Sequence, residues 1–85
     1  MKITVKFMGL ASIVLDKNHE IIELTERKKV RDVVSLLREK AKTAGVNADA
    51  TLDHATFLVN KKKADMNTEL QDGDELMIMK SLGGG

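Results

Sequence analysis

The residues that offer chemistry in this chain stand at its end, where the sequence closes on Gly83, Gly84 and Gly85. Glycine has no Cβ, so a run of glycines makes a thin arm with great backbone freedom. We expect a compact body of residues 1–80 and a flexible tail of residues 81–85. Two interpretations are open: a frayed end without function, or a Gly85 carboxylate that reacts inside another protein's active site.

Other reactive groups are scarce in the sequence. The chain has no cysteine, which excludes disulfides, thiolate metal sites and a cysteine nucleophile. His19 and His54 are far apart in sequence and lack a partner at metal-ligand spacing, so both are interpreted as surface residues. The acidic residues around Gly73 lack the spacing of a calcium loop and indicate a turn. We therefore expect no catalytic site, no metal and no bound cofactor in this domain.

Length and charge limit the class of protein. A chain of 85 residues forms one domain. Its 14 basic and 13 acidic residues leave a net charge of +1, which gives no field suited to nucleic acid. No apolar run approaches the ~20 residues of a membrane-spanning helix, and the N-terminus lacks a signal-peptide apolar region. The expectation is a soluble cytoplasmic protein that binds neither nucleic acid nor membrane.

The body that must carry the tail begins with two strands. Residues 2–8 alternate apolar and polar side chains, which predicts a half-buried strand. Residues 10–15 are interpreted as a loop or a single helical turn. Residues 19–24 predict a second strand that forms a hairpin with the first. Ile22 and Leu24 are taken as its inward side chains, with Ile21 as a competitor.

A helix follows, marked by an apolar stripe at helical spacing that comprises Val30, Val33, Val34, Leu37, Ala41 and Ala44. Gly45 stands where a C′ residue would end it. The start is poorly marked, because Lys28 and Lys29 occupy the positions of a capping residue. Thr25 is the nearest residue of a type that caps helices.

The second half of the chain predicts three more strands. Residues 46–54 are polar and are interpreted as a loop. Residues 55–60 predict a third strand, residues 61–63 its turn and residues 64–66 a short fourth strand. A turn at Asp72-Gly73 leads into the last strand, residues 76–80.

This order gives an α+β domain in which one helix covers one face of a mixed sheet. The first and last strands can lie side by side at the centre, where they would anchor the tail. The inward side chains are then Ile3, Val5, Phe7, Phe57, Val59, Leu76 and Ile78. Apolar residues on the opposite, outward face suggest a partner-docking surface: Met8, Leu58, Met77 and Met79, extended by Leu82 in the tail. The alternative is that these are scattered surface side chains.

Several features together resemble the MoaD/ThiS family of β-grasp, ubiquitin-like sulfur carriers. They are the first strand over residues 2–7, Val59-Asn60 before a tight turn, the turn and strand of residues 70–76, and the terminal Gly84-Gly85. The resemblance covers the whole chain. It implies a β-grasp fold, with a mixed four- to five-stranded sheet and one main helix packed on one face.

The resemblance also implies a chemistry. An enzyme of the ubiquitin-activating type would adenylate the Gly85 carboxylate with ATP, and a sulfur donor would convert it to a thiocarboxylate. Gly83 and Gly84 would let the tail enter a narrow active site. The carrier would then serve molybdopterin or thiamin synthesis, in the first case as the small subunit of a synthase-like complex. The length and the Asp72–Glu75 turn favour molybdopterin, whereas the missing proline before the tail weakens that assignment.

Two other functions stay open. A ubiquitin-like modifier would share the adenylate and then join Gly85 to lysines of target proteins. A plain interaction module would use the β-grasp surface and leave the glycines without a role. The sequence does not separate these alternatives, nor does it separate tRNA thiolation from cofactor synthesis.

Overall fold

The protein is described here by a computed structural model that covers residues 1–26 and 28–81. Its elements in chain order are β1 (Lys2–Gly9), α1 (Leu10–Val14), β2 (His19–Glu23), α2 (Val30–Thr43), α3 (Asp49–Asp53), β3 (Thr56–Val59), β4 (Lys62–Ala64) and β5 (Glu75–Lys80). The short helix α1 is one of the two interpretations that the sequence left open for residues 10–15. The division of the chain into a body of residues 1–80 and a tail of residues 81–85 stays a prediction.

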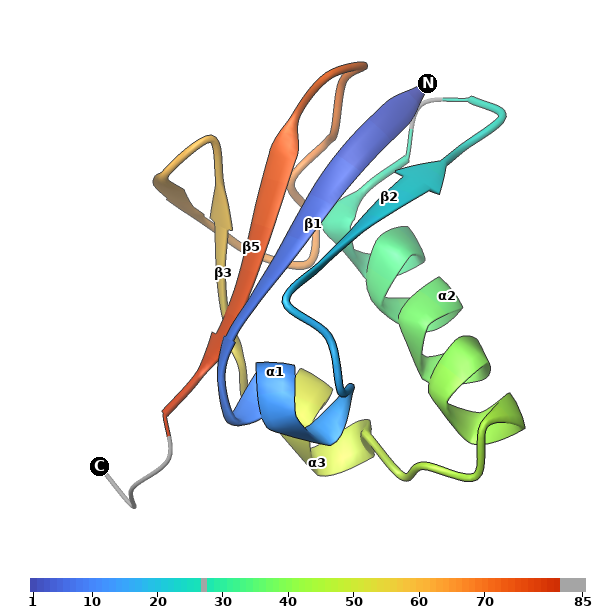
Figure 1. Ribbon diagram of the computed structural model, residues 1–85. Helices are drawn as coiled ribbons and strands as arrows, with labels where there is room; N and C mark the ends of the chain where they lie inside the picture. Colours follow the sequence, from blue (N-terminus) through green and yellow to red (C-terminus); the bar gives the residue numbers. More distant parts are fainter. Residues whose placement is uncertain (27, 82–85) are drawn as a thin grey trace.

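The strands form one mixed sheet in the order β2-β1-β5-β3-β4, with α2 on one side of it (Figure 1). β1 and β5 are parallel, in a register that runs from Thr4 opposite Glu75 to Gly9 opposite Lys80. The other neighbouring pairs are antiparallel. The predicted central position of the first and last strands is therefore confirmed, and the sheet has five strands under one main helix.

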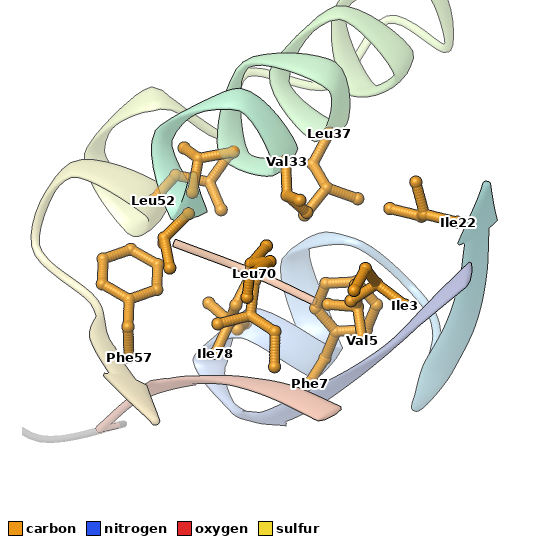
Figure 2. Packing of buried hydrophobic residues seen from close by; sticks show 14 of the residues in the cluster. Ile3, Val5, Phe7, Ile22, Val33, Leu37, Leu52, Phe57, Leu70 and Ile78 are labelled. Carbon is orange, nitrogen blue, oxygen red and sulfur yellow. The ribbon is translucent and has the colours of Figure 1, made fainter. Parts of the chain in front are cut away.

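The core lies between the sheet and α2, where aliphatic side chains from both layers meet (Figure 2). Six of the seven predicted inward side chains of β1, β3 and β5 are buried, and Val59 is half-buried against the core. In β2, Ile22 is 2% exposed and Ile21 is 64% exposed, so Ile22 is the inward residue. The period-two alternation of the strands thus sorts side chains between core and solvent as expected.

The helix α2 ends near Gly45, as the sequence predicts. Gly45 has φ +80°, a conformation that glycine adopts without strain. The Gly45 N–H donates to the Lys42 carbonyl at 3.0 Å, and the Val46 N–H donates to the Ala41 carbonyl at 2.8 Å. This pair of hydrogen bonds is a Schellman motif, which satisfies carbonyls that the helix leaves free.

α2 begins at one of the two lysines that the sequence places in the capping position. Its N-cap is Lys29, and the Lys29 N–H donates to Asp32 Oδ2 at 2.9 Å. The next two helical N–H groups donate to the carbonyls of Thr68 and Met66, at 2.9 and 3.1 Å. A distant loop therefore supplies the acceptors that a Ser, Thr or Asp cap would otherwise provide.

The prediction of a loop over residues 46–54 is wrong, because this segment contains α3. Leu52 is fully buried and Thr51 is 6% exposed, so the short helix contributes to the core. The helix is tied to α2 by Arg38, which forms ion pairs with Asp49 and Asp53. Five residues are too few to show a helical period in the sequence. The residue that pairs with its two aspartates, Arg38, lies on another helix.

The turn predicted at residues 61–63 is also misplaced. The reversal occurs at Asn60 and Lys61, whose φ angles of +50° and +70° fit the two central residues of a type I′ hairpin turn. Lys62 and Lys63 therefore belong to β4, and the predicted strand over residues 64–66 begins earlier and ends at Ala64. Asn60 is held by its side chain, which donates to Asp74 Oδ1 at 2.9 Å.

Candidate functional site

The root of the predicted tail lies at the end of β5, the middle strand of the sheet (Figure 1). β5 pairs with β1 on one side and with β3 on the other up to Met79, and Lys80 lies opposite Gly9. Ser81 follows as an exposed residue. Leu82, Gly83, Gly84 and Gly85 lie outside the described residues, so their assigned roles stay predictions.

Gly9 is fitted to the tail root by close contact. It has φ +64°, and a Cβ built on it would lie 2.2 Å from the carbonyl oxygen of Lys80. A side chain at this position would therefore push the backbone of residue 80 away from β1. The Gly9 carbonyl also accepts a hydrogen bond from Ser12 Oγ at 2.8 Å, which ties the root to α1. In the sequence Gly9 directly follows the alternating residues 2–8, which gives no sign of this contact.

The four described residues of the predicted docking surface lie together on the outward face, beside the tail root. We call Met8, Leu58, Met77 and Met79 the methionine patch. Met8 is opposite Met79 across the β1–β5 pair, and Leu58 is opposite Met77 across the β3–β5 pair. Met8 and Met79 are 46% and 38% exposed, and the other two are half-buried. Docking of a partner on this patch stays a prediction.

Charged side chains border the methionine patch. Lys6 lies opposite Met77 on β1, and its Nζ is 3.2 Å from Glu75 Oε2. On the other side, Lys63 of β4 is opposite Leu58 and exposed. The arrangement is an apolar centre with a lysine on each flank, which resembles the core and polar rim of a protein–protein interface.

The described residues hold no group of three or more His, Cys, Asp or Glu side chains that could bind a metal ion. His19 and His54 are both exposed and lie on different elements, β2 and the end of α3. Within residues 1–26 and 28–81, no helix is long and apolar enough to cross a membrane.

Among the described residues, Glu20 has a carboxyl group with a shifted pKa, but this group belongs to a structural ion pair. Partial burial of Glu20 opposes its ionisation, yet hydrogen bonds and Coulombic attraction from Lys17 and Lys40 outweigh that effect and hold its pKa below the usual value. Lys17 Nζ lies 2.6 Å from Glu20 Oε1, and Lys40 of α2 bonds the other oxygen. A carboxyl with a lowered pKa stays ionised near neutral pH, so it does not suit general acid catalysis.

A cavity of about 360 Å³ lies beside this ion pair, between the α1–β2 connection and the C-terminal half of α2. Its floor is apolar and includes Phe7, Leu15 and Leu37, while Lys17 and Lys40 stand at its rim. The polar side chains of its lining are Asp16, Lys17 and Lys40, and both lysines are paired with Glu20. The tail root with the methionine patch beside it stays the predicted functional site.

Comparison with known proteins adds independent information. The model of the ThiS family matches residues 5–85. A search of curated proteins gives no match.

Solved structures match over nearly the full chain. A putative molybdopterin converting factor, subunit 1, from Pyrococcus furiosus has a TM-score of 0.76 at 22% identity and covers 96% of this chain and 99% of its own. SAMP1 from Haloferax volcanii has a TM-score of 0.76 at 20% identity, with 100% of both chains covered.

A complex of subunits 1 and 2 of molybdopterin-converting factor from Helicobacter pylori matches with a TM-score of 0.68 at 22% identity, again with 100% of both chains covered. At these identities the similarity establishes the fold, which is the ubiquitin-like β-grasp predicted from the sequence. The expected arrangement of sheet and helix is thereby confirmed.

Proposed function

Because the chain belongs to the ThiS family, within the wider group of ubiquitin-fold sulfur carriers and modifiers, we propose that it is a sulfur carrier whose Gly85 carboxylate is the reactive group. The observation that supports this most directly is the position of the tail root. It leaves the middle strand of the sheet beside an exposed apolar patch. A carrier needs both features, a reactive end and a surface that brings this end to the right enzyme.

The proposed chemistry has two steps. In the active site of a ubiquitin-activating-type enzyme, a Gly85 carboxylate oxygen attacks the α-phosphorus of ATP and pyrophosphate leaves, which forms an acyl-adenylate. A sulfur donor then delivers a sulfide equivalent to the carbonyl carbon, and AMP leaves. The product is a C-terminal thiocarboxylate. The carrier is a protein cosubstrate without catalysis or a bound cofactor of its own, and ATP is consumed by its partner.

Glycine suits this role for steric reasons. Residues 80–85 can extend over ~20 Å, which lets a terminal group enter a site while the domain stays outside. Without side chains, Gly83 and Gly84 pass through a narrow channel and let the backbone approach the nucleotide. The root must not move as the tail is drawn in, and the parallel β1–β5 pairing together with the Gly9 contact holds Lys80 in place.

The methionine patch is the proposed docking surface for the activating enzyme and for a downstream synthase subunit. Methionine side chains are flexible and polarisable, so one patch can adapt to two different partners. The similar H. pylori protein is described in complex with a second subunit of molybdopterin-converting factor. By analogy, we assign this chain a synthase-like partner in molybdopterin or thiamin synthesis. We expect this work to take place in the cytoplasm, where ATP is available to the activating enzyme.

A second candidate is a protein modifier that is joined through Gly85 to target lysines. It is favoured by the similarity to H. volcanii SAMP1, described in a second structure as small archaeal modifier protein 1. Both functions share the acyl-adenylate and differ in the nucleophile that follows, sulfide or a lysine amine.

Intact-mass and peptide mass spectrometry of the protein isolated from its own cells tests the proposal. We expect an oxygen-to-sulfur mass increase that maps to Gly85. Branched peptides that join Gly85 to lysine would instead support the modifier. As a control, a variant that lacks Gly84 and Gly85 should show neither product and should support no ATP–pyrophosphate exchange. Unchanged function of that variant would overturn both candidates.

A further inference from the structure

β2 forms one border of the sheet. β1 lies on one side of it, and within residues 1–26 and 28–81 no strand lies on the other side (Figure 1). An open strand edge exposes unpaired N–H and C=O groups and can accept another strand. β2 lacks two of the residues that often block a strand edge, because it contains no lysine and the whole chain contains no proline. Its charged residues are Glu20, which is engaged by Lys17 and Lys40, and Glu23.

The hydrogen bonds of β2 identify which residues face the open edge. The Leu24 N–H donates to the Met1 carbonyl at 2.7 Å, and at the other end the Phe7 N–H donates to the Asn18 carbonyl at 2.9 Å. Residues alternate along an antiparallel strand between the two edges. Even-numbered residues of β2 therefore bond to β1, and the odd-numbered His19, Ile21 and Glu23 direct their backbone groups to the open edge.

The same three residues place their side chains on the outward face of the sheet. In the β1–β2 register, Ile22 is opposite Ile3 and both are buried, so the odd-numbered neighbours point away from the core. Ile21 is 64% exposed, the largest exposed fraction among the large hydrophobic side chains of the described residues. It stands between a histidine and a glutamate, each two residues away.

This arrangement is self-complementary. We propose that β2 pairs antiparallel with β2 of a second copy of this chain, across a two-fold axis at Ile21. In that register Ile21 faces Ile21 of the other copy, and His19 of each copy faces Glu23 of the other. The backbone groups of all three residues then exchange hydrogen bonds, and two sheets join into one. The proposal goes beyond the carrier function and does not depend on it.

Neighbouring registers are less favourable. A two-fold axis at Glu23 would set two glutamates against each other, and like charges directly opposite each other destabilise a strand pair. An axis at His19 would set two histidines against each other, and each Ile21 would then face Lys17 of the other copy instead of an isoleucine. The Ile21-centred register combines an apolar pair with two His–Glu pairs, and it uses the full length of β2.

A second apolar side chain lies near this edge on the helix side. Leu36 of α2 is 36% exposed and lines a hollow together with Leu24, the residue that follows β2. A two-fold axis perpendicular to the sheet keeps both copies of α2 on the same face. The hollow lined by Leu36 and Leu24 of each copy then lies on the same face of the joined sheet, beside the end of β2.

The pairing leaves the tail root accessible. β1 separates β2 from β5, so five strand spacings, or about 24 Å, lie between the two β5 strands of the pair. Because the paired strands are antiparallel, the two tail roots point to opposite ends of the joined sheet. Each methionine patch stays exposed, and two activating partners can engage the pair at once.

The contact is small, since one pair of five-residue strands falls in the size range of weak, transient interfaces. The test is a dilution series of the full chain from millimolar to low micromolar concentration, followed by backbone NMR and sedimentation. We expect a monomer–dimer equilibrium and concentration-dependent amide shifts confined to residues 18–24 and 36. A monomer at all concentrations, or shifts that map to the methionine patch, would overturn the proposal.

Variants distinguish pairing in this register from non-specific association. Ile21→Lys should weaken association at least tenfold, whereas Met79→Lys, which also replaces an exposed outward side chain, should not change it. His19→Glu should weaken association, because it sets two glutamates against each other, and the double variant His19→Glu/Glu23→Lys should restore it, because opposite charges then face each other. Association that survives Ile21→Lys, or a double variant no better than His19→Glu, would contradict the two-fold pairing.

Discussion

The two faces of β1 and β5 carry different kinds of side chain on the same backbone. The inner face presents Ile3, Val5, Leu76 and Ile78, all fully buried. The outer face presents the three methionines of the methionine patch. Met8 and Met79 are exposed, and Met77 is half-buried. Branched aliphatic side chains have few rotamers and pack tightly, whereas methionine is unbranched and adapts to its contacts.

On the proposed function, this difference separates the residues that stabilise the fold from those that bind a partner. Because side chains alternate along a strand, one residue can hold the core while its neighbour meets a partner. Substitutions on the inner face should therefore affect unfolding, and substitutions on the outer face should affect binding. Neighbouring positions in β5 allow a direct comparison of the two.

The largest effect is expected on the inner face. Ile78→Ala removes a fully buried side chain beneath α2 and should lower the free energy of unfolding by about 2–5 kcal/mol. Met79→Ala, one residue along and 38% exposed, should cost less than about 1 kcal/mol. Urea unfolding followed by far-UV circular dichroism measures both, since the chain has no tryptophan or tyrosine. Equal losses would contradict the division between the faces.

Gly9→Ala should have the next largest effect, because it acts where the two central strands meet the tail root. The positive φ and the clash with the Lys80 carbonyl together should cost about 1–3 kcal/mol and shift the amide resonances of Lys80 and Ser81. Gly73→Ala is the matched control. Gly73 has φ +85°, but a Cβ there would meet nothing within 4 Å.

Gly73→Ala should therefore lower the free energy of unfolding only through backbone strain, and the tail root should stay unchanged. If the two variants lose equal stability, or if Lys80 and Ser81 do not respond to Gly9→Ala, close packing at the root has no role.

Met77→Glu tests the outer face. A charge at the centre of the methionine patch should weaken binding to the activating enzyme about tenfold, or 1.4 kcal/mol, with the fold retained. Ile21→Glu is the control, since it places the same charge on the same face at the far border of the sheet. Calorimetric titration of both variants provides the comparison. A folded Met77→Glu protein with unchanged affinity would exclude the patch as the docking surface.

The smallest effect is expected from the ion pair that links β2 to α2. The pKa of Glu20 is lowered in the folded protein, so the carboxylate adds stability at neutral pH that is lost as the pH falls below its usual value of 4.5 and through the folded value. Glu20→Gln should cost less than about 1 kcal/mol at pH 7 and converge with wild type in acid. Thermal unfolding across pH measures the difference.

Glu26→Gln is the control for Glu20, because the Glu26 side chain is 75% exposed and 3.6 Å from Lys28. Glu26→Gln should cost less stability at pH 7 than Glu20→Gln does. A Glu20→Gln profile parallel to wild type down to acid pH would remove the ion pair from the account of stability.

Periodicity predicted the parts of the fold that repeat along the chain. Alternation placed Met8 and Met79 on one face, and the apolar stripe located α2. The missed features depend on partners distant in sequence. α3 is held by Arg38 of another helix, and the start of α2 is satisfied by carbonyls of residues 66 and 68.

The candidate site likewise has one part that the sequence predicts and one part that it does not. The outward face could be read from side-chain parity, since a strand exposes alternate residues. The role of Gly9 could not be predicted from the sequence, because it depends on the close approach of Lys80, which the sequence does not reveal. A glycine immediately after an alternating strand was the available sign, and it is common at strand ends for many reasons.

The parallel pairing of β1 with β5 also has a consequence for folding. The register sets Thr4 against Glu75, so the centre of the sheet forms only when nearly the whole chain is available. Contacts of such long sequence separation slow folding relative to helical domains of similar size. During synthesis, residues 1–64 lack the strand that joins β1 to β3. The tail root therefore becomes structured only after β5 has been synthesised, and a chain that stops before β5 has no anchored tail root.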